Sequence, residues 1–281
     1  MPTGMPTRKD RTDDVAQAQG DWQYGYGADG VALVRYERGE RDGRPWADRL
    51  EVVDPRADLT AQAAFVQTEL AGWVVSGPFT LGEELVRQGA TVLRHGHTMH
   101  RSLTDTPPPE GWAAWARTPF RDGLRAVPCD RGAEELAPVS RAAFGPGHPD
   151  HVPAEEQGDQ GEQGELGEQA KVGKLAALLA GQVIGPLLPS SALVVDGTDR
   201  VVAGAVLTDW NGLPWIAHVF RDPARGYPGL GRDLLRRVIA DVATGGATEI
   251  GLAVTEGNRA QQLYEELGFT TTRSSLTVVV P

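Results

Sequence analysis

Three glycines and an arginine precede a stretch of helical periodicity in the last quarter of the sequence. The glycines are Gly226, Gly229 and Gly231, and Arg232 follows them directly. Apolar residues then recur at helical spacing over 230–242. The first N–H groups of a helix lack intrahelical partners, and the helix dipole favours negative charge there. Because glycine has no Cβ, these N–H groups can approach an anion closely. The turn is therefore a candidate phosphate or pyrophosphate site.

The same turn has a plain structural alternative. Glycine-rich connections between a strand and a helix are common, and such a turn can bind nothing at all. Two better-known phosphate loops are excluded, because no Gly-Lys-Ser/Thr follows the glycines and the turn lacks the third glycine of the dinucleotide fingerprint. The turn alone leaves a phosphate site and a non-binding connection open.

The segments around the turn must position it. Apolar periodicity predicts a buried strand over 216–220, a helix over 230–242, a strand over 250–254 and a helix over 260–267. Asn258 is a favourable N-cap for the last helix. The expected order is strand, glycine turn, helix, strand, capped helix.

This order of motifs resembles the GNAT superfamily of coenzyme A-dependent N-acyltransferases. The resemblance is carried by Pro223, Gly229–Arg232 (GLGR), Asn258 and Leu263–Phe269 (LYEELGF). It covers about residues 121–281 and implies an α/β (α+β) fold with a mixed, mostly antiparallel twisted sheet flanked by helices. It also implies acetyl-CoA (coenzyme A) as co-substrate and direct transfer of an acetyl group to a small amine or a peptide amine.

The resemblance assigns the cofactor contacts as well. The backbone of Val219, Phe220 and Arg221 would pair with the pantetheine arm like an added strand. Asn258 would contact the pantetheine or the far end of the cofactor. Tyr264 would lie near the sulfur, where a phenol can protonate a departing thiolate. The pyrophosphate would be wrapped by Tyr227, Pro228, Gly229, Leu230, Gly231 and Arg232.

Three positions depart from the family pattern. Gly226 stands where the family usually has Gln or Arg, Pro228 removes one N–H from the cradle, and Ala253 replaces the catalytic Glu of some members. These departures favour a second hypothesis, a non-catalytic acyl-CoA-binding sensor or regulatory module.

The general base has to come from elsewhere in the chain. An acceptor amine is protonated at neutral pH and must lose a proton before it attacks a thioester. His218, on the strand that precedes the glycine turn, is the candidate base, and Asp209 and Glu256 are the alternatives.

Composition narrows the partners and the location. The chain has 281 residues, a formal net charge of −11 and a single cysteine, Cys129. The negative charge argues against nucleic acid as the main partner and suits a cationic acceptor. The sequence shows neither an apolar run long enough to span a membrane nor a signal peptide. We expect a cytoplasmic protein without disulfides, and the sequence leaves the oligomeric state open, a homodimer included.

The remaining segments suggest a second, smaller unit. Residues 1–25 read as a disordered tail, 26–120 as an N-terminal α/β unit, and 121–281 as the acetyltransferase domain. An acidic, glycine-rich insertion at 153–170 is expected to be disordered. The outline of the segment that starts at Leu81 repeats in the segment that starts at Leu263. The N-terminal unit is thus interpreted as a degenerate GNAT-like copy without the glycine cradle, against the alternative of chance similarity.

Three histidines, His95, His97 and His100, fall on one predicted strand in the N-terminal half. Neither a carboxylate nor a thiol stands at metal-ligand spacing beside them. We expect solvated or hydrogen-bonded side chains at these positions and no metal site.

Overall fold

The computed structural model describes residues 22–41, 43–54, 56, 58–115, 120, 123–150, 162–225 and 227–281. The chain divides into two compact units. Unit 1 runs to His95 and includes Ser275–Pro281, and unit 2 comprises Gly96–Ser274. Strands β5 (Thr91–Ser102) and β11 (Thr270–Val279) therefore contribute residues to both units. This division differs from the boundary between residues 120 and 121 expected from the sequence. Strand pairing decides which segments pack together, and the proline-rich connector, residues 106–109 (TPPP), does not.

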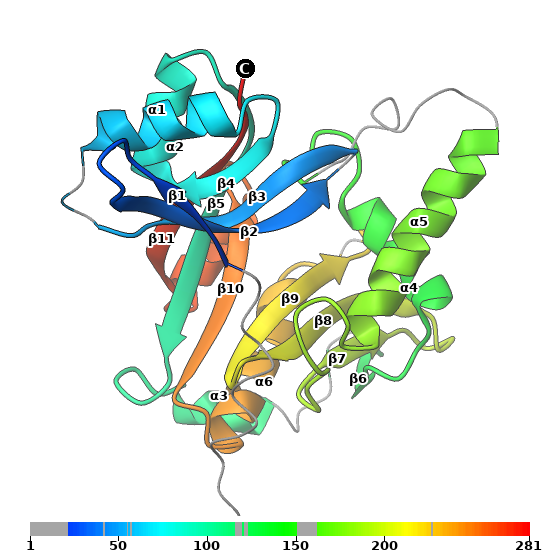
Figure 1. Ribbon diagram of the computed structural model, residues 1–281. Helices are drawn as coiled ribbons and strands as arrows, with labels where there is room; N and C mark the ends of the chain where they lie inside the picture. The colour runs from blue at the N-terminus through cyan, green and yellow to red at the C-terminus, as the bar shows by residue number, and fades with distance from the viewer. Residues whose placement is uncertain are drawn as a thin grey trace, which may run out of the picture. The chain divides into compact units, whose positions relative to one another are not determined.

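Unit 1 is a sheet with two helices. Its strand order is β1-β2-β3-β4-β11, and all pairs with registered partners are antiparallel except the parallel pair of β3 and β4. Buried aliphatic residues of the strands and both helices form its core. The elements are β1 (Trp22–Tyr26), β2 (Ala32–Arg41), β3 (Arg44–Val52), α1 (Leu59–Glu69), β4 (Val74–Pro78) and α2 (Phe79–Arg87) (Figure 1).

Strand β1 corrects the extent of the expected N-terminal tail. Residues 22–25 were assigned to the tail, but they pair with β2, and residues 1–21 lie outside the described part. Aromatic side chains favour strands, and the ring of Trp22 packs under the guanidinium of Arg35 at 4.5 Å. This cation–π contact adds to the backbone pairing that holds β1 in place.

Unit 2 carries the segments that the sequence singled out. Its strand order is β11-β5-β10-β9-β8-β7-β6, with β9 and β10 parallel. The apolar side of α6 packs on one face of this sheet, and residues of α4 and α5 pack on the other (Figure 1). The further elements are α3 (Glu110–Trp115), β6 (Arg125–Pro128), α4 (Ala133–Ala143), α5 (Glu162–Leu179), β7 (Ala192–Val195), β8 (Val201–Trp210), β9 (Leu213–Arg221), α6 (Leu230–Thr244), β10 (Glu249–Thr255) and α7 (Ala260–Glu266).

The predicted fold class is confirmed: both units have mixed, mostly antiparallel sheets flanked by helices. One expectation about local order was wrong. Helix α5 begins at Glu162, so residues 162–170 of the expected disordered insertion are helical, and the earlier part of the insertion lies outside the described residues. Composition alone missed this, because Glu and Gln are good helix formers that extend a helix already favoured from Lys171 onward.

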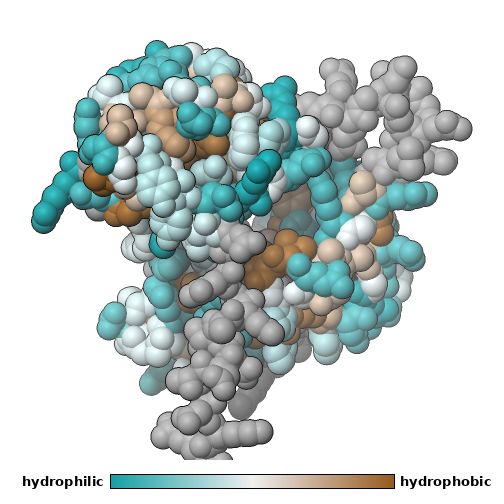
Figure 2. Space-filling view, in the orientation of Figure 1, coloured by the Kyte–Doolittle hydropathy of each residue, from teal (hydrophilic) through white to brown (hydrophobic). Residues whose placement is uncertain are grey.

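The surface of the described residues is mostly hydrophilic on the face shown in Figure 2, where hydrophobic side chains form small separate groups. Single exposed apolar residues such as Val183 are normal on soluble surfaces. In the part of the chain that the structure describes, no helix is long and apolar enough to cross a membrane.

Candidate active site

Strands β9 and β10 pair over a short distance and then separate. Their parallel register joins only Trp215 to Gly251 and Ile216 to Leu252. On the other side of β9, the pairing with β8 shifts at Ala217, which is the extra residue of a β-bulge. A bulge bends its strand, so β9 turns away from β10 after Ile216. The β10-facing backbone of β9 beyond this point has no strand partner among the described residues, and an extended, amide-containing ligand could pair with it.

The three β9 residues expected to contact the cofactor lie beyond the bulge. The side chain of Val219 packs toward α6, whereas Phe220 is buried on the side of α4 and α5. Arg221 is exposed. With Val219 and Phe220 packed on opposite faces of the sheet, the strand edge presents backbone rather than side chains to a ligand, which agrees with the expected backbone pairing.

The N-terminus of α6 is open. Gly229 precedes the helix with φ of 82° and no side chain caps the helix, a left-handed conformation that glycine adopts without strain. The first backbone bond of the helix runs from the Asp233 N–H to the Gly229 carbonyl at 3.0 Å. Within the described residues, the N–H groups of Gly229, Gly231 and Arg232 donate to no other group. These three donors and the helix dipole make a site that fits an anion.

The residues next to these donors provide no free N–H groups to the anion site and instead hold the turn in place. Pro228 has no N–H, and the Leu230 N–H donates to the Tyr227 carbonyl at 3.3 Å. The side chains of Leu230 and Tyr227 pack into the core of unit 2 and so anchor the loop. Gly226 lies outside the described residues.

Arg232 is paired with a carboxylate, which the sequence did not indicate. Its guanidinium donates to Glu266, and both side chains are largely exposed. Exposed ion pairs contribute little to stability because water and salt screen them. The Arg232 side chain therefore remains available to a more highly charged group at the start of α6.

Asn258 bonds to the start of α7, although Arg259 and not Asn258 occupies the N-cap position. Its side-chain Oδ1 accepts from the Ala260 N–H at 2.9 Å, while its Nδ2 donates to Asp150 Oδ2 at 3.3 Å. Thr255 at the end of β10 donates to the other oxygen of Asp150. Asp150 thus joins the segment after α4 to the connection between β10 and α7. A single Asp in a Gly/Pro-rich segment carries no sequence signal, so the sequence analysis missed this residue.

Tyr264 lies on α7 and is 8% exposed. Burial, and secondarily the negative charge of Asp150, raises the pKa of Tyr264 to about 12. The ring packs against Phe269 with 6.0 Å between centroids. At neutral pH the phenol is protonated and can act as a proton donor.

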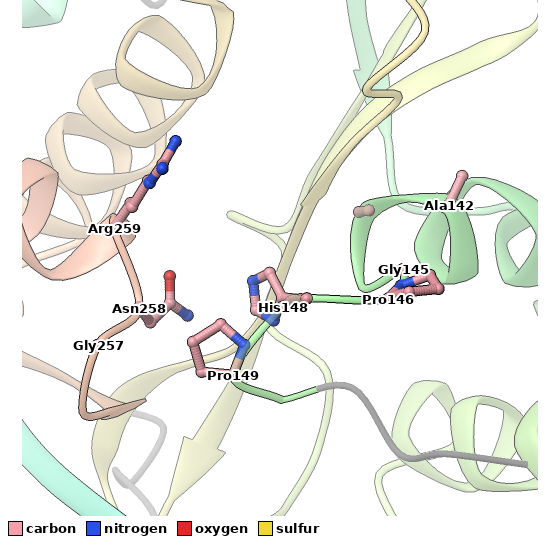
Figure 3. Close-up of a pocket in the computed structure, with 10 residues that line it drawn as sticks. Ala142, Gly145, Pro146, His148, Pro149, Gly257, Asn258 and Arg259 are labelled. Atoms are coloured by element: carbon pink, nitrogen blue, oxygen red, sulfur yellow. The ribbon is translucent and has the colours of Figure 1, made fainter.

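A pocket of about 600 Å³ opens between the end of α4 and the start of α7. Figure 3 shows His148 and Asn258 projecting into it from its two sides, with the Arg259 guanidinium extending away from the Asn258 amide. Of the site residues expected from the sequence, Asn258 lines this pocket. The complete lining is Ala142, Ala143, Gly145, Pro146, Gly147, His148, Pro149, Gly257, Asn258 and Arg259.

His218 lies on the α4 side of the sheet, against Ser140 and Phe144. A hydrogen bond of 2.7 Å joins its Nε2 to the Ser140 hydroxyl, and its ring stacks on Phe144 with 5.2 Å between centroids. Burial lowers the pKa of His218 to about 4, so the imidazole is neutral at pH 7. Its role as general base stays a prediction.

The lowered pKa of His218 predicts a pH dependence of stability. Between pH 6.5 and 4 the unfolded chain binds a proton at this residue and the folded chain does not, so stability decreases as the pH decreases through this range. A shift from 6.5 to about 4 corresponds to about 3 kcal/mol. We expect the free energy of unfolding, measured with urea at several pH values, to decrease less between pH 6.5 and 4 in a His218→Gln variant than in the wild type. Equal losses in both proteins would contradict the assignment.

The alternative base Glu256 and two of the three histidines have hydrogen-bond partners. His97 bonds to the Ser274 hydroxyl at 2.9 Å and to Glu256 at 2.5 Å. His100 bonds to Glu249 at 3.1 Å. The predicted hydrogen-bonded roles of His97 and His100 are confirmed.

A comparison with protein families gives the family of the segment that carries these residues. Residues 174–269 match the model of the acetyltransferase (GNAT) family. Residues 174–269 form a GNAT domain. The matched range contains the separating strands, the open start of α6 and helix α7, so the GNAT domain includes all the site residues predicted from the sequence. No curated protein matches the sequence significantly.

Solved structures share the fold with this chain. A GCN5-related N-acetyltransferase from Sphaerobacter thermophilus matches with a TM-score of 0.55 and 17% identity over 90% of this chain and 78% of its own. One from Kribbella flavida gives 0.53 and 17% over 93% and 90%. A tandem GNAT protein from the clavulanic acid biosynthesis pathway gives 0.55 and 14% over 89% and 78%. At these identities the likeness concerns the fold. The GNAT domain itself supports an acyl-CoA-dependent acyltransferase.

Proposed function

We propose that this protein is an N-acetyltransferase that transfers the acetyl group of acetyl-CoA directly to a primary amine. One observation carries the proposal. Strand β9 pairs with β10 over only two positions and leads into a helix whose first N–H groups are open and whose preceding residue, Gly229, has no Cβ. A strand edge followed by an anion site matches a ligand with an amide-containing arm and a diphosphate. The proposal includes a cytoplasmic location, which the single cysteine supports.

The residues present fit the cofactor, and each has a definable task. Acetyl-CoA would supply the acyl group as a thioester. The backbone of 219–221 would hold its amide-containing arm, and the N–H groups of Gly229, Gly231 and Arg232 would hold the diphosphate. Asn258 would bind through its side-chain amide, which already lies at the pocket.

Two side chains would handle protons. The Tyr264 phenol, protonated because of burial, would donate its proton to the departing thiolate. The neutral imidazole of His218 is the candidate acceptor for the proton of the amine, although a pKa of about 4 makes it a weak base. Much of the acceleration would come from holding both reactants together.

Unit 1 resembles unit 2 in its connections, and we propose that it is a degenerate copy. Its β3 and β4 also pair in parallel over only two positions, Trp46 with Val74 and Ala47 with Val75. The pairing of β3 with β2 also shifts shortly afterwards, next to Arg49 with φ of 47°. A helix, α1, follows β3 as α6 follows β9. The sequence repeat and the shared topology support a common origin.

The details of unit 1 argue against a cofactor site there. At the start of α1 the Asp58 carboxylate accepts from the Thr60 N–H at 3.0 Å, so a negative charge already caps the helix. The fully buried Leu50 side chain packs beside Gly77 of β4. In unit 1 this side chain therefore occupies space between β3 and β4, the strands that correspond to β9 and β10 of unit 2. We expect calorimetry to measure one CoA bound per chain. A stoichiometry of two would show that unit 1 binds the cofactor as well.

The function is tested by adding acetyl-CoA and a panel of primary amines and following the release of free thiol. The panel would contain spermidine, tyramine, glucosamine and a peptide with a free N-terminus. Thiol release that requires one of the amines supports the acetyltransferase. The second candidate, a non-catalytic acyl-CoA sensor, is favoured by Pro228 and by Ala253. It predicts tight binding of acetyl-CoA without thiol release, and absence of binding would defeat both.

A further inference from the structure

We propose that the Asp150 carboxylate is the binding site for the cationic amine of the acceptor. The proposal rests on the proposed function and names a residue that selects the substrate class. It starts from the position of the carboxylate, which is fixed by hydrogen bonds from Thr255 and Asn258. Thr255 ends β10 and Asn258 precedes α7, so Asp150 lies against this connection, next to Asn258, which lines the pocket.

The accessibility of Asp150 suits a ligand. Its side chain is 30% exposed, so a cation can reach the carboxylate from solvent while the anchoring bonds hold it in one place. The residues beside it, His148 and Pro149, line the pocket. Carboxylates held in a partly desolvated site bind ammonium groups through charge-assisted hydrogen bonds. A preorganised acceptor of this kind loses little side-chain entropy on binding.

The charges around the site favour a cation. Directly after this carboxylate, residues 153–170 contain six acidic and no basic residues. Arg259 contributes to the pocket lining, and its guanidinium extends away from the Asn258 amide (Figure 3). The imidazole of His148 lies 3.8 Å from the Asp150 carboxylate. The formal net charge of −11 would raise the concentration of cationic amines around the protein.

The consequence for the reaction is orientation. An ammonium group bound to Asp150 would be held beside Thr255 and Asn258, at the connection that leads into α7, the helix that carries Tyr264. The acceptor nitrogen would then lie on the side of the pocket where Tyr264 is proposed to protonate the leaving thiolate. Asp150 would determine which acceptors bind, and the candidate base would still have to remove the proton.

The test compares wild type with Asp150→Asn, using the amine that wild type acetylates best. We expect KM for this amine to rise about 30-fold because one partner of a charge pair is removed. The Kd of the same amine for the complex of protein and free CoA, measured by calorimetric titration, should rise by the same factor. Free CoA carries no acyl group, so no transfer occurs during this measurement. The Kd for CoA should stay within twofold, and added salt should raise KM for the wild type more than for the variant.

Three further variants keep the result interpretable. Asp241→Asn removes an equal charge from an exposed position of α6. It should leave both the KM for the amine and the Kd for CoA unchanged. Thr255→Val removes one hydrogen bond to Asp150 and keeps its charge, so it should weaken amine binding less than Asp150→Asn does. Asp150→Glu should restore part of the binding.

Two outcomes would overturn the proposal. Amine binding that is equal in wild type and Asp150→Asn would show that another group holds the cation. Tighter CoA binding in the variant would show that Asp150 occupies part of the cofactor position instead. If wild type acetylates none of the amines, the proposed function fails, and this proposal fails with it. If wild type acetylates an amine and its KM is the same in Asp150→Asn, this proposal alone is defeated.

Discussion

A Gly231→Glu variant is expected to bind CoA at least about 100-fold more weakly than wild type while keeping its thermal stability. The loss in affinity follows from the open donors at the start of α6, because each charge-assisted hydrogen bond contributes about 1.5–3 kcal/mol. A carboxylate beside these donors would compete with the diphosphate and repel it. The fold should tolerate the change, since a Cβ at position 231 meets nothing within 4 Å and Glu is favourable in the first turn of a helix.

The measurement is a pair of titrations, one calorimetric with CoA and one thermal. Gly231→Ala is the milder variant. It should weaken CoA binding while stabilising the helix by up to about 1 kcal/mol. Gly173→Ala on α5 is the matched control, because that position also has open space around it and should change stability without changing affinity. Full retention of CoA binding in Gly231→Glu would refute the start of α6 as the diphosphate site.

A Tyr264→Phe variant should lose about 10²-fold to 10⁴-fold in kcat, the usual contribution of a general acid. The structure keeps this phenol protonated, because burial and Asp150 raise its pKa to about 12. Its proton is therefore available throughout the pH range in which the amine can react. We expect the kcat of wild type to show no decrease from loss of this proton below about pH 11.

Affinity separates this role from a structural one. The Kd for CoA should be unchanged in Tyr264→Phe, because the phenyl ring keeps the contact with Phe269. Tyr36→Phe in unit 1 removes another partly buried phenol with a raised pKa and serves as the control with normal kcat. If the turnover of Tyr264→Phe is within threefold of wild type, the residue belongs to the core alone.

Periodicity predicted the elements of unit 2 closely where one face is buried and a glycine ends the element. Helix α6 was expected over 230–242 and ends at Thr244, before Gly245. Strand β3 shows where the pattern fails. The apolar residues Leu50, Val52 and Val53 indicate a strand only over 50–53, whereas the strand runs from Arg44 to Val52. Its pairing shift and the positive φ of Arg49 interrupt the alternation of inward and outward residues, so the pattern before that point is not recognisable.

The candidate site was predictable in its local parts. Gly229 and Asn258 have roles that neighbouring residues define, a left-handed turn and a hydrogen bond to the start of a helix, and such roles leave a mark in the sequence. The bulge at Ala217 leaves none, because it depends on the register of β8. Asp150 was equally hidden, since its partner Asn258 is 108 residues away and only the tertiary structure brings the two together.

The exchange of strands between the two halves of the chain bears on how the protein is made. Ser76 in β4 and Thr277 in β11 share a hydrogen bond of 2.9 Å across 201 residues. Contacts between such distant residues form slowly during folding. The sheet of unit 1 cannot be completed until the ribosome has synthesised the residues of unit 2. A fragment that ended at the proline-rich connector would leave β4 with an unpaired edge that invites aggregation, so the two halves depend on each other already during translation.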